Sequence, residues 1–246
     1  MMILRRNLPE ILMFLAILAI GALDLAVYSG VVQGEDAVRI GRGAGLSEDE
    51  AVGDLRNAAD LAELDDSDDL PGRYVPSQGR GHTGTSIPLA ERVPFCEGEA
   101  SEDCYASNPP TSGLHVAVQR DAQLGDGNVI NIPPDPGIYE FEIPREAIPH
   151  LQEHAGLFLG YRCDDPACEA IVERTRALVE EELSLGARVV MAPSSDLAED
   201  TMALASWTRI DSFSLEDFGE ARVRDFIKAH SCRFDPEGFC PETAVN

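Results

Sequence analysis

The pattern of apolar and polar positions predicts most of the regular elements in the second half of the chain. Ile138–Ile143 alternates between apolar and polar residues, as a half-buried strand does, and Leu157–Tyr161 is a short apolar run typical of a buried strand. Apolar residues recur at helical spacing in Pro166–Leu185, and Gly186 follows as a stop signal, so this stretch is the clearest predicted helix. The expected elements are strands at 138–143, 157–161, 188–192 and 203–209, and helices at 144–154, 166–185 and 215–230.

Taken in chain order, these elements form the series β-α-β-α-β-β-α, which is the order of a thioredoxin-like core. We therefore expect a single compact α/β domain, although the first helix carries no C-x-x-C pair and redox chemistry does not follow from the topology. Pro149 would interrupt the first helix, which begins either near Pro144 or at Pro149 itself. The chain from Tyr74 to the first strand is rich in Gly, Pro, Ser and Thr, which predicts long ordered loops, with a further polar loop at Gln123–Pro136.

The N-terminus has the pattern of a membrane segment. Basic residues at the start are followed by an apolar stretch from Ile11 to Val32, interrupted by Asp24, which fits an uncleaved anchor over residues 1–33 with its N-terminus in the cytoplasm. The alternative is a cleaved signal peptide, because the uninterrupted core Ile11–Leu23 has the length of a signal sequence. Either interpretation places the rest of the chain in the periplasm or at the cell exterior.

Composition separates a tether from a folded domain. Residues 34–71 include a strongly acidic stretch without aromatic residues, which favours an extended or weakly helical tether, whereas 72–246 is long enough for one α/β domain. The formal net charge is −25, from 44 acidic and 19 basic residues. Such a chain repels phosphate, so we expect no binding of nucleic acid. Neither a P-loop nor a dinucleotide fingerprint is present, so we expect no nucleotide either.

The six cysteines fall in three close pairs and agree with export. Local disulfides are the simplest pairing and persist in an oxidising compartment. Thiolate ligation of a metal is the weaker alternative, because none of the pairs has the short C-x-x-C spacing of zinc knuckles. The expected disulfides are Cys96–Cys104, Cys163–Cys168 and Cys232–Cys240.

Histidines carry the candidate chemistry. Four of the five lie in short motif-like settings, at His82, His115, His150 and His154. If the helix at 144–154 forms, His150 and His154 are spaced i and i+4 on one face and can share a metal ion. Glu153 could support such a site as a neighbour of a ligand, an ionic ligand or a base. His230, outside these motifs, is expected to be an ordinary residue of the last helix.

At these motifs the chain resembles a bacterial family known as domain of unknown function 3105. The matching pieces are Tyr74-Val-Pro-Ser-Gln-Gly-Arg-Gly-His82, Tyr105-Ala-Ser-Asn-Pro-Pro-Thr-Ser-Gly-Leu-His115, Gly137-Ile-Tyr139, His150-Leu-Gln-Glu-His154 and Leu204-Ala-Ser-Trp207-Thr-Arg209. The resemblance covers roughly residues 74 to 230 and implies a membrane segment with an outward domain, but no reaction. Gln152 and Ala155 depart from the family pattern without removing a metal-binding side chain, and Phe95–Cys104 is an elaboration on that pattern.

These observations predict a membrane-anchored extracytoplasmic protein that binds copper or zinc through the four histidines, without an assigned catalytic residue. Met191 and Met202 could add soft copper(I) ligands but are expected to be core residues. The alternative is a non-catalytic accessory or assembly subunit of a membrane complex, in which the histidines only order the loops. The string His-x-x-Glu-His also matches an inverted zinc-protease motif, but the short helix is a poor copy of the long one in those enzymes.

Overall fold

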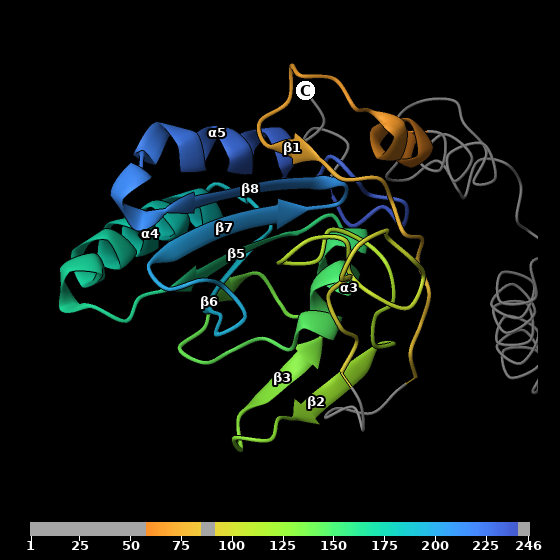
Figure 1. The fold of residues 1–246 in the computed structure, drawn as a ribbon, viewed down its shortest axis with the longest axis horizontal. Helices are drawn as coiled ribbons and strands as arrows, with labels where there is room; N and C mark the ends of the chain where they lie inside the picture. The colour runs from red at the N-terminus through yellow and green to blue at the C-terminus, as the bar shows by residue number, and fades with distance from the viewer. Residues whose placement is uncertain (1–57, 85–91, 241–246) are drawn as a thin grey trace, which may run out of the picture. The chain divides into compact units, whose positions relative to one another are not determined.

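The computed structural model describes residues 58–84 and 92–240, all within one compact unit of the chain (Figure 1). The expected anchor, residues 1–33, lies outside these ranges. Among the helices within them, none is long and apolar enough to cross a membrane.

A mixed sheet forms the centre of the fold (Figure 1). Strand β5 pairs in parallel with β6 and in antiparallel with β7, so the buried residue Phe158 has Val190 on one side and Ala205 on the other. The parallel pair needs a crossover, which α4 (Pro166–Ser184) supplies, whereas β7 and its other antiparallel neighbour, β8, are joined by a tight turn. In sheet order the strands are β1 (Arg73–Tyr74), β8 (Arg209–Ser214), β7 (Thr201–Ser206), β5 (Leu157–Arg162), β6 (Val189–Pro193) and β4 (Gly137–Ile138).

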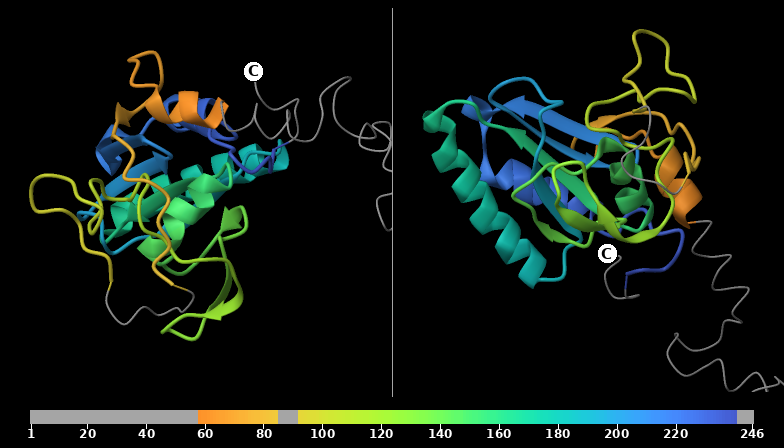
Figure 2. Two further views of the ribbon diagram at one scale, coloured as in Figure 1. Left: turned by 90° about the vertical axis from the view of Figure 1, so that its right-hand side faces the viewer. Right: turned by 90° about the horizontal axis from the view of Figure 1, so that it is seen from below.

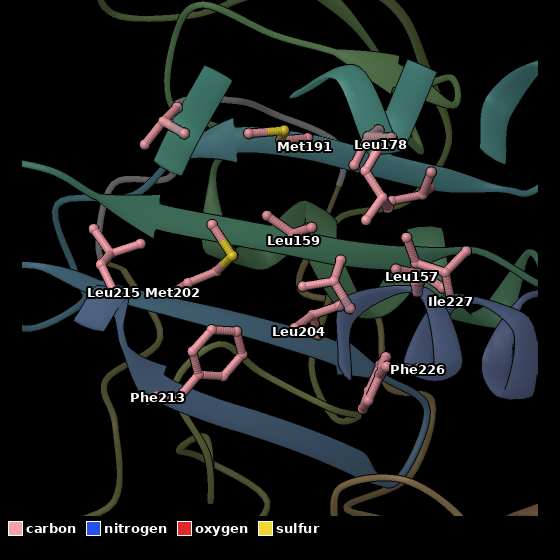
Figure 3. Packing of buried hydrophobic residues seen from close by; sticks show 14 of the residues in the cluster. Leu157, Leu159, Leu178, Met191, Met202, Leu204, Phe213, Leu215, Phe226 and Ile227 are labelled. Carbon is pink, nitrogen blue, oxygen red and sulfur yellow. The ribbon is translucent and has the colours of Figure 1, made fainter. Parts of the chain in front are cut away.

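Two helices, α4 (Pro166–Ser184) and α5 (Glu220–His230), cover one face of the sheet. Helix α5 places Val223, Phe226 and Ile227 at the spacing of one helical face, and all three are fully buried. They pack against strand residues that alternate inwards, as the close view in Figure 3 shows. The labelled members of this core on the sheet are Leu157, Leu159, Met191, Met202, Leu204 and Phe213.

The opposite face is covered by a short helical segment and a hairpin. The 3₁₀ turn η1 (Arg145–Ala147) leads directly into α3 (Ile148–Glu153), and the strands β2 (Gln119–Gln123) and β3 (Val129–Ile132) form a two-stranded hairpin. Figure 2 shows this hairpin projecting away from the main sheet. Its buried residues pack with α3 against the other side of β5 and β6, which makes the second core.

The structure confirms a mixed α/β domain but corrects several expected elements. The first strand, expected at 138–143, is reduced to β4 at the sheet edge, and the polar loop expected at Gln123–Pro136 contains β3. The single strand expected at 203–209 is the end of β7, a turn at Trp207–Thr208 and the start of β8. The order from β4 onwards is therefore β-α-β-α-β-β-β-α, and the seven-element thioredoxin-like order is wrong.

The turn between β7 and β8, at Trp207–Thr208, was not predicted because neither residue is a typical turn former. Thr208 has a φ of 61°, a left-handed conformation that a β-branched residue rarely adopts. Tertiary contacts hold it there: the Thr208 main-chain NH donates to the carbonyl oxygen of Thr111 at 2.9 Å, and the Arg233 guanidinium donates to the main-chain oxygen of Trp207.

The segment preceding β1 is part of the folded unit, although composition assigned it to the tether. Residues 58–64 are helical, and Ala59 is buried against Trp207 and Phe234. The buried Arg209 guanidinium donates to the main-chain oxygens of Asp65 and Ser67, at 2.7 Å and 2.9 Å. These bonds hold the segment against β8.

All six cysteines form the three expected disulfides, Cys96–Cys104, Cys163–Cys168 and Cys232–Cys240. The first clasps a loop of the N-terminal half and the second joins the end of β5 to the first turn of α4. The third closes the loop that follows α5. Three disulfides in a chain of this size indicate an oxidising, extracytoplasmic environment.

Candidate metal centre

Two loop segments, far apart in sequence, place His82 beside His115. Residues 79–84 and 113–117 run side by side in parallel and exchange main-chain hydrogen bonds outside any named strand. The His115 NH donates to the oxygen of Gly81 at 2.7 Å, and the Thr83 NH donates to the oxygen of His115 at 2.8 Å. The same register brings the two imidazoles together, with ring centres 4.5 Å apart.

Helix α3 supplies the other two histidines at the predicted spacing. Pro149 lies at the N-terminal end of α3, where it needs no NH partner, and His154 is the C-terminal cap. The ring centres of His150 and His154 are 4.7 Å apart. Ala155 follows with a φ of 65°, the left-handed conformation that commonly ends a helix.

The loops and the helix bring all four predicted histidines into one cluster. The rings of His82, His115 and His150 form a triangle with centre distances of 4.5 Å, 4.9 Å and 5.9 Å, and His154 adjoins His150. His115, His150 and His154 are buried, whereas His82 is exposed, so the cluster reaches the surface at His82.

The distances within the His82–His115–His150 triangle are close to those expected for three histidine ligands of one tetrahedral metal ion. With metal–nitrogen bonds of about 2.0 Å, the ring centres lie about 3 Å from the ion and therefore about 5 Å from each other. The orientations of the side chains, unlike the spacing of the rings, do not yet match such a site. Within the described part of the chain, no group of three or more His, Cys, Asp or Glu side chains is arranged to hold a metal ion as it stands.

Carbonyl oxygens fix the orientation of two of the rings. Nδ1 of His115 lies 2.9 Å from the main-chain oxygen of Gly113, and Nδ1 of His150 lies 2.6 Å from that of Val116. Because a carbonyl oxygen can only accept, both Nδ1 atoms carry the hydrogen. Nε2 is then the atom with a free lone pair in each neutral ring, and hydrogen bonds of this type commonly orient metal-binding histidines.

Glu153 faces the most deeply buried of these nitrogens. Nε2 of His115 is fully buried and makes no hydrogen bond of good geometry, although Oε2 of Glu153 lies 3.1 Å away. On its other side Glu153 meets the Arg80 guanidinium at 3.8 Å. Burial raises the pKa of Glu153, but His115, Arg80 and His150 together outweigh it and leave the pKa below its ordinary value. Glu153 is therefore ionised and places a negative charge beside the histidine cluster.

Burial also keeps the helical histidines neutral. It lowers the pKa of His154 to about 4, with a further contribution from the positive charge that His150 would carry. The pKa of His150 is lowered for the same first reason, although its bond to the Val116 oxygen opposes the shift. Neutral imidazole is the form that binds metals, so both rings are available as donors at neutral pH.

A disulfide-closed loop, Cys232–Cys240, covers the cluster at His154. The Phe239 ring stacks on His154 with centres 4.1 Å apart and planes 19° from parallel. Oε2 of Glu237 lies 3.4 Å from Nε2 of His154. Burial raises the pKa of Glu237, as do the negative charges of Glu153 and Asp235.

The remaining candidates lie elsewhere. Met191 and Met202 are fully buried in the core beneath α4 and α5, as expected, and α3 lies on the other face of the sheet. His230 ends α5 and its Nε2 donates to the main-chain oxygen of Pro71 at 2.8 Å. Sequence reasoning missed Glu237 and Phe239, because no motif marks the loop that carries them, and it assigned no role to Arg80 although this residue lies in the motif that ends at His82.

The family model for "Protein of unknown function (DUF3105)" matches residues 99–242, more than half of the chain. The chain belongs to this family. The DUF3105 match includes His115, His150 and His154 and also the Cys232–Cys240 loop, whereas His82 precedes it. No curated protein and no solved structure matches the chain.

Proposed function

We propose that the protein binds a transition metal ion, copper or zinc, through His82, His115, His150 and His154. Glu153 supports this site by facing His115. The role of the site is metal handling outside the cytoplasm or support of an extracytoplasmic partner.

The buried Nε2 atom of His115 carries the proposal. It is fully buried, makes no hydrogen bond of good geometry, and lies 3.1 Å from a carboxylate oxygen of Glu153. A buried polar atom without a partner costs about 1–3 kcal/mol. A cation between the rings would satisfy the nitrogen and offset the negative charge of Glu153.

The arrangement needs only local adjustment to form a site. The spacing of the His82, His115 and His150 rings already fits, and rotation about the side-chain bonds of His82 changes where its nitrogens point without moving the backbone. His82 has the room to rotate because it is exposed. Rotamer changes of exposed side chains are fast and inexpensive compared with movement of a helix.

The location completes the proposal. The apolar N-terminal segment, residues 1–33, anchors the protein in the membrane and the acidic stretch that follows holds the domain in the periplasm or at the cell exterior. The three disulfides support an oxidising location for the domain.

A second candidate is an accessory or assembly subunit of a membrane complex. The bond of His150 to the Val116 oxygen favours it, because it ties the loop 113–117 to α3 without any metal, while the bond of His115 to the Gly113 oxygen orders the loop itself. In that case the histidines are structural, and removal of one would loosen the loop but change no metal affinity.

Metal titration of the purified protein distinguishes the two candidates. The protein is prepared without a histidine tag, stripped with a chelator, and titrated with zinc and with copper, followed by elemental analysis. We expect about one ion per chain, and in His150→Gln an affinity lower by more than about 100-fold, since loss of a ligand exceeds the 10–100-fold effect of a second-shell change.

His230→Gln is the matched control, because it removes a buried histidine outside the cluster and keeps a donor for the Pro71 oxygen. Near-UV circular dichroism checks that both variants fold. Equal affinity of the parent and His150→Gln, or no bound ion in the parent, would reject the metal site and leave the structural interpretation.

A further inference from the structure

The Cys232–Cys240 loop is held on the histidine cluster at several points. The Cys232 NH donates to the Ala155 oxygen at 3.0 Å, directly after the end of α3. Arg188 contacts both the end of α3 and the loop. Its Nε donates to the His154 oxygen at 3.0 Å, and its guanidinium lies over the Phe239 ring at 5.6 Å. The position of the loop relative to His154 is therefore determined by both of its ends.

Within the loop, the backbone conformation presents Glu237 to the cluster. The Asp235 carboxylate accepts hydrogen bonds from the NH groups of Phe239 and Cys240, both at 2.8 Å, and so closes a tight turn. Gly238 has a φ of 73°, which a residue with a side chain rarely adopts. The turn leaves Glu237 at its tip with its carboxylate 3.4 Å from Nε2 of His154.

The donors around the cluster are nitrogen and oxygen atoms. All six cysteines are in disulfides, and Met191 and Met202 are fully buried in the core beneath α4 and α5. Copper(I) prefers thiolate and thioether sulfur, whereas imidazole with carboxylate suits divalent ions such as zinc. Two carboxylates, Glu153 and Glu237, adjoin the rings, so the local charge also favours a divalent ion over a monovalent one.

We propose that Glu237 is an oxygen ligand of the site, delivered by the Cys232–Cys240 loop, and that the bound ion is divalent, with zinc as the best fit, rather than copper(I). This inference rests on the proposed metal-binding function. Phe239 covers His154 on the side from which the loop arrives, so the loop both completes the site and shields it from water.

The test compares Glu237→Gln with the parent and with Glu216→Gln, a control at an exposed acid outside the loop. The full-length protein, stripped of metal, is titrated with Zn²⁺, with Co²⁺ and, under anaerobic conditions, with copper(I). We expect Glu237→Gln to bind Zn²⁺ at least about 10-fold more weakly than the parent, and Glu216→Gln to bind it equally well.

Co²⁺ gives a readout that a merely structural role would not change. Loss of an oxygen ligand alters the energy and intensity of its visible absorption bands, whereas a stabilising contact outside the coordination sphere leaves them unchanged. We expect the Co²⁺ complexes of the parent and of Glu216→Gln to give the same spectrum, and that of Glu237→Gln to give a different one.

The outcomes separate the inference from the function on which it rests. Equal Zn²⁺ affinity and equal Co²⁺ spectra for Glu237→Gln and the parent reject Glu237 as a ligand, while binding by the parent retains the histidine site. If the parent binds copper(I) more tightly than Zn²⁺, the proposal that the site holds a divalent ion is rejected. Failure of the parent to bind any of the three ions rejects both proposals.

Discussion

His230 should make the stability of this protein fall as the pH is lowered. Its ring is 2 % exposed, packs against Phe226 and donates from Nε2 to the Pro71 oxygen. Burial lowers the pKa of His230 to about 3, and the nearby charges of Arg233 and Arg209 act in the same direction. In the unfolded chain the pKa returns to about 6.5, so below that pH the unfolded state binds a proton that the folded state does not.

The size of the effect follows from these two values. Above pH of about 6.5 both states are neutral at His230 and the residue causes no pH dependence. As the pH falls towards 3, the free energy of unfolding falls by about 1.4 kcal/mol for each pH unit, which amounts to about 2 kcal/mol at pH 5. His154, whose pKa is lowered to about 4, contributes a second loss of similar size over this range.

Urea denaturation at pH 7.5 and pH 5.0 measures this contribution, with the parent compared to His230→Gln. The difference between the two proteins isolates His230, because His154 and the carboxylates titrate alike in both. We expect the variant to lose about 2 kcal/mol less than the parent between the two pH values. An equal loss in both proteins would refute the argument that His230 is buried in its neutral form.

Two further predictions concern packing and the loop. A Cβ atom at Gly156 would lie 2.5 Å from Cδ1 and 2.9 Å from the main-chain oxygen of Leu151, so Gly156→Ala should lower the free energy of unfolding by about 1–3 kcal/mol. Gly125→Ala meets no atom within 4 Å and should change it by less than about 0.5 kcal/mol in the same denaturation assay. The double variant Cys232→Ser/Cys240→Ser opens a loop with a sequence separation of 8 and should cost about 2.5 kcal/mol of stability. It should also weaken Zn²⁺ binding in the titration described above, and unchanged affinity would show that the loop is not part of the site.

Much of the fold could be predicted from local sequence. The helix Pro166–Ser184 and the strands β5 and β6 lie where the periodicity placed them, because each buries its own apolar residues against the centre of the domain. The disulfides also followed from sequence, since cysteines 5 or 8 residues apart have few other partners within reach. The hairpin β2–β3 was missed because β2 is polar and largely exposed and β3 is only four residues long, so neither strand gives a strong pattern by itself.

The histidine cluster was predicted in part. His150 and His154 share a face because of the helical period, which sequence alone reveals. Their meeting with His82 and His115 depends on main-chain bonds between residues 79–84 and 113–117, about 30 residues apart, and no local pattern encodes that register.

The sequence by itself therefore determined the class of fold, the positions of its main helices and central strands, the disulfide pairs and the four histidines that carry the candidate chemistry. These depend on periodicity and spacing, which are local properties of the chain. Only the tertiary structure decided that Arg80 reaches Glu153, that Thr208 adopts a turn, and that Glu237 and Phe239 lie against His154. Those contacts join segments far apart in sequence, and their energies exist only when the folded chain brings the segments together.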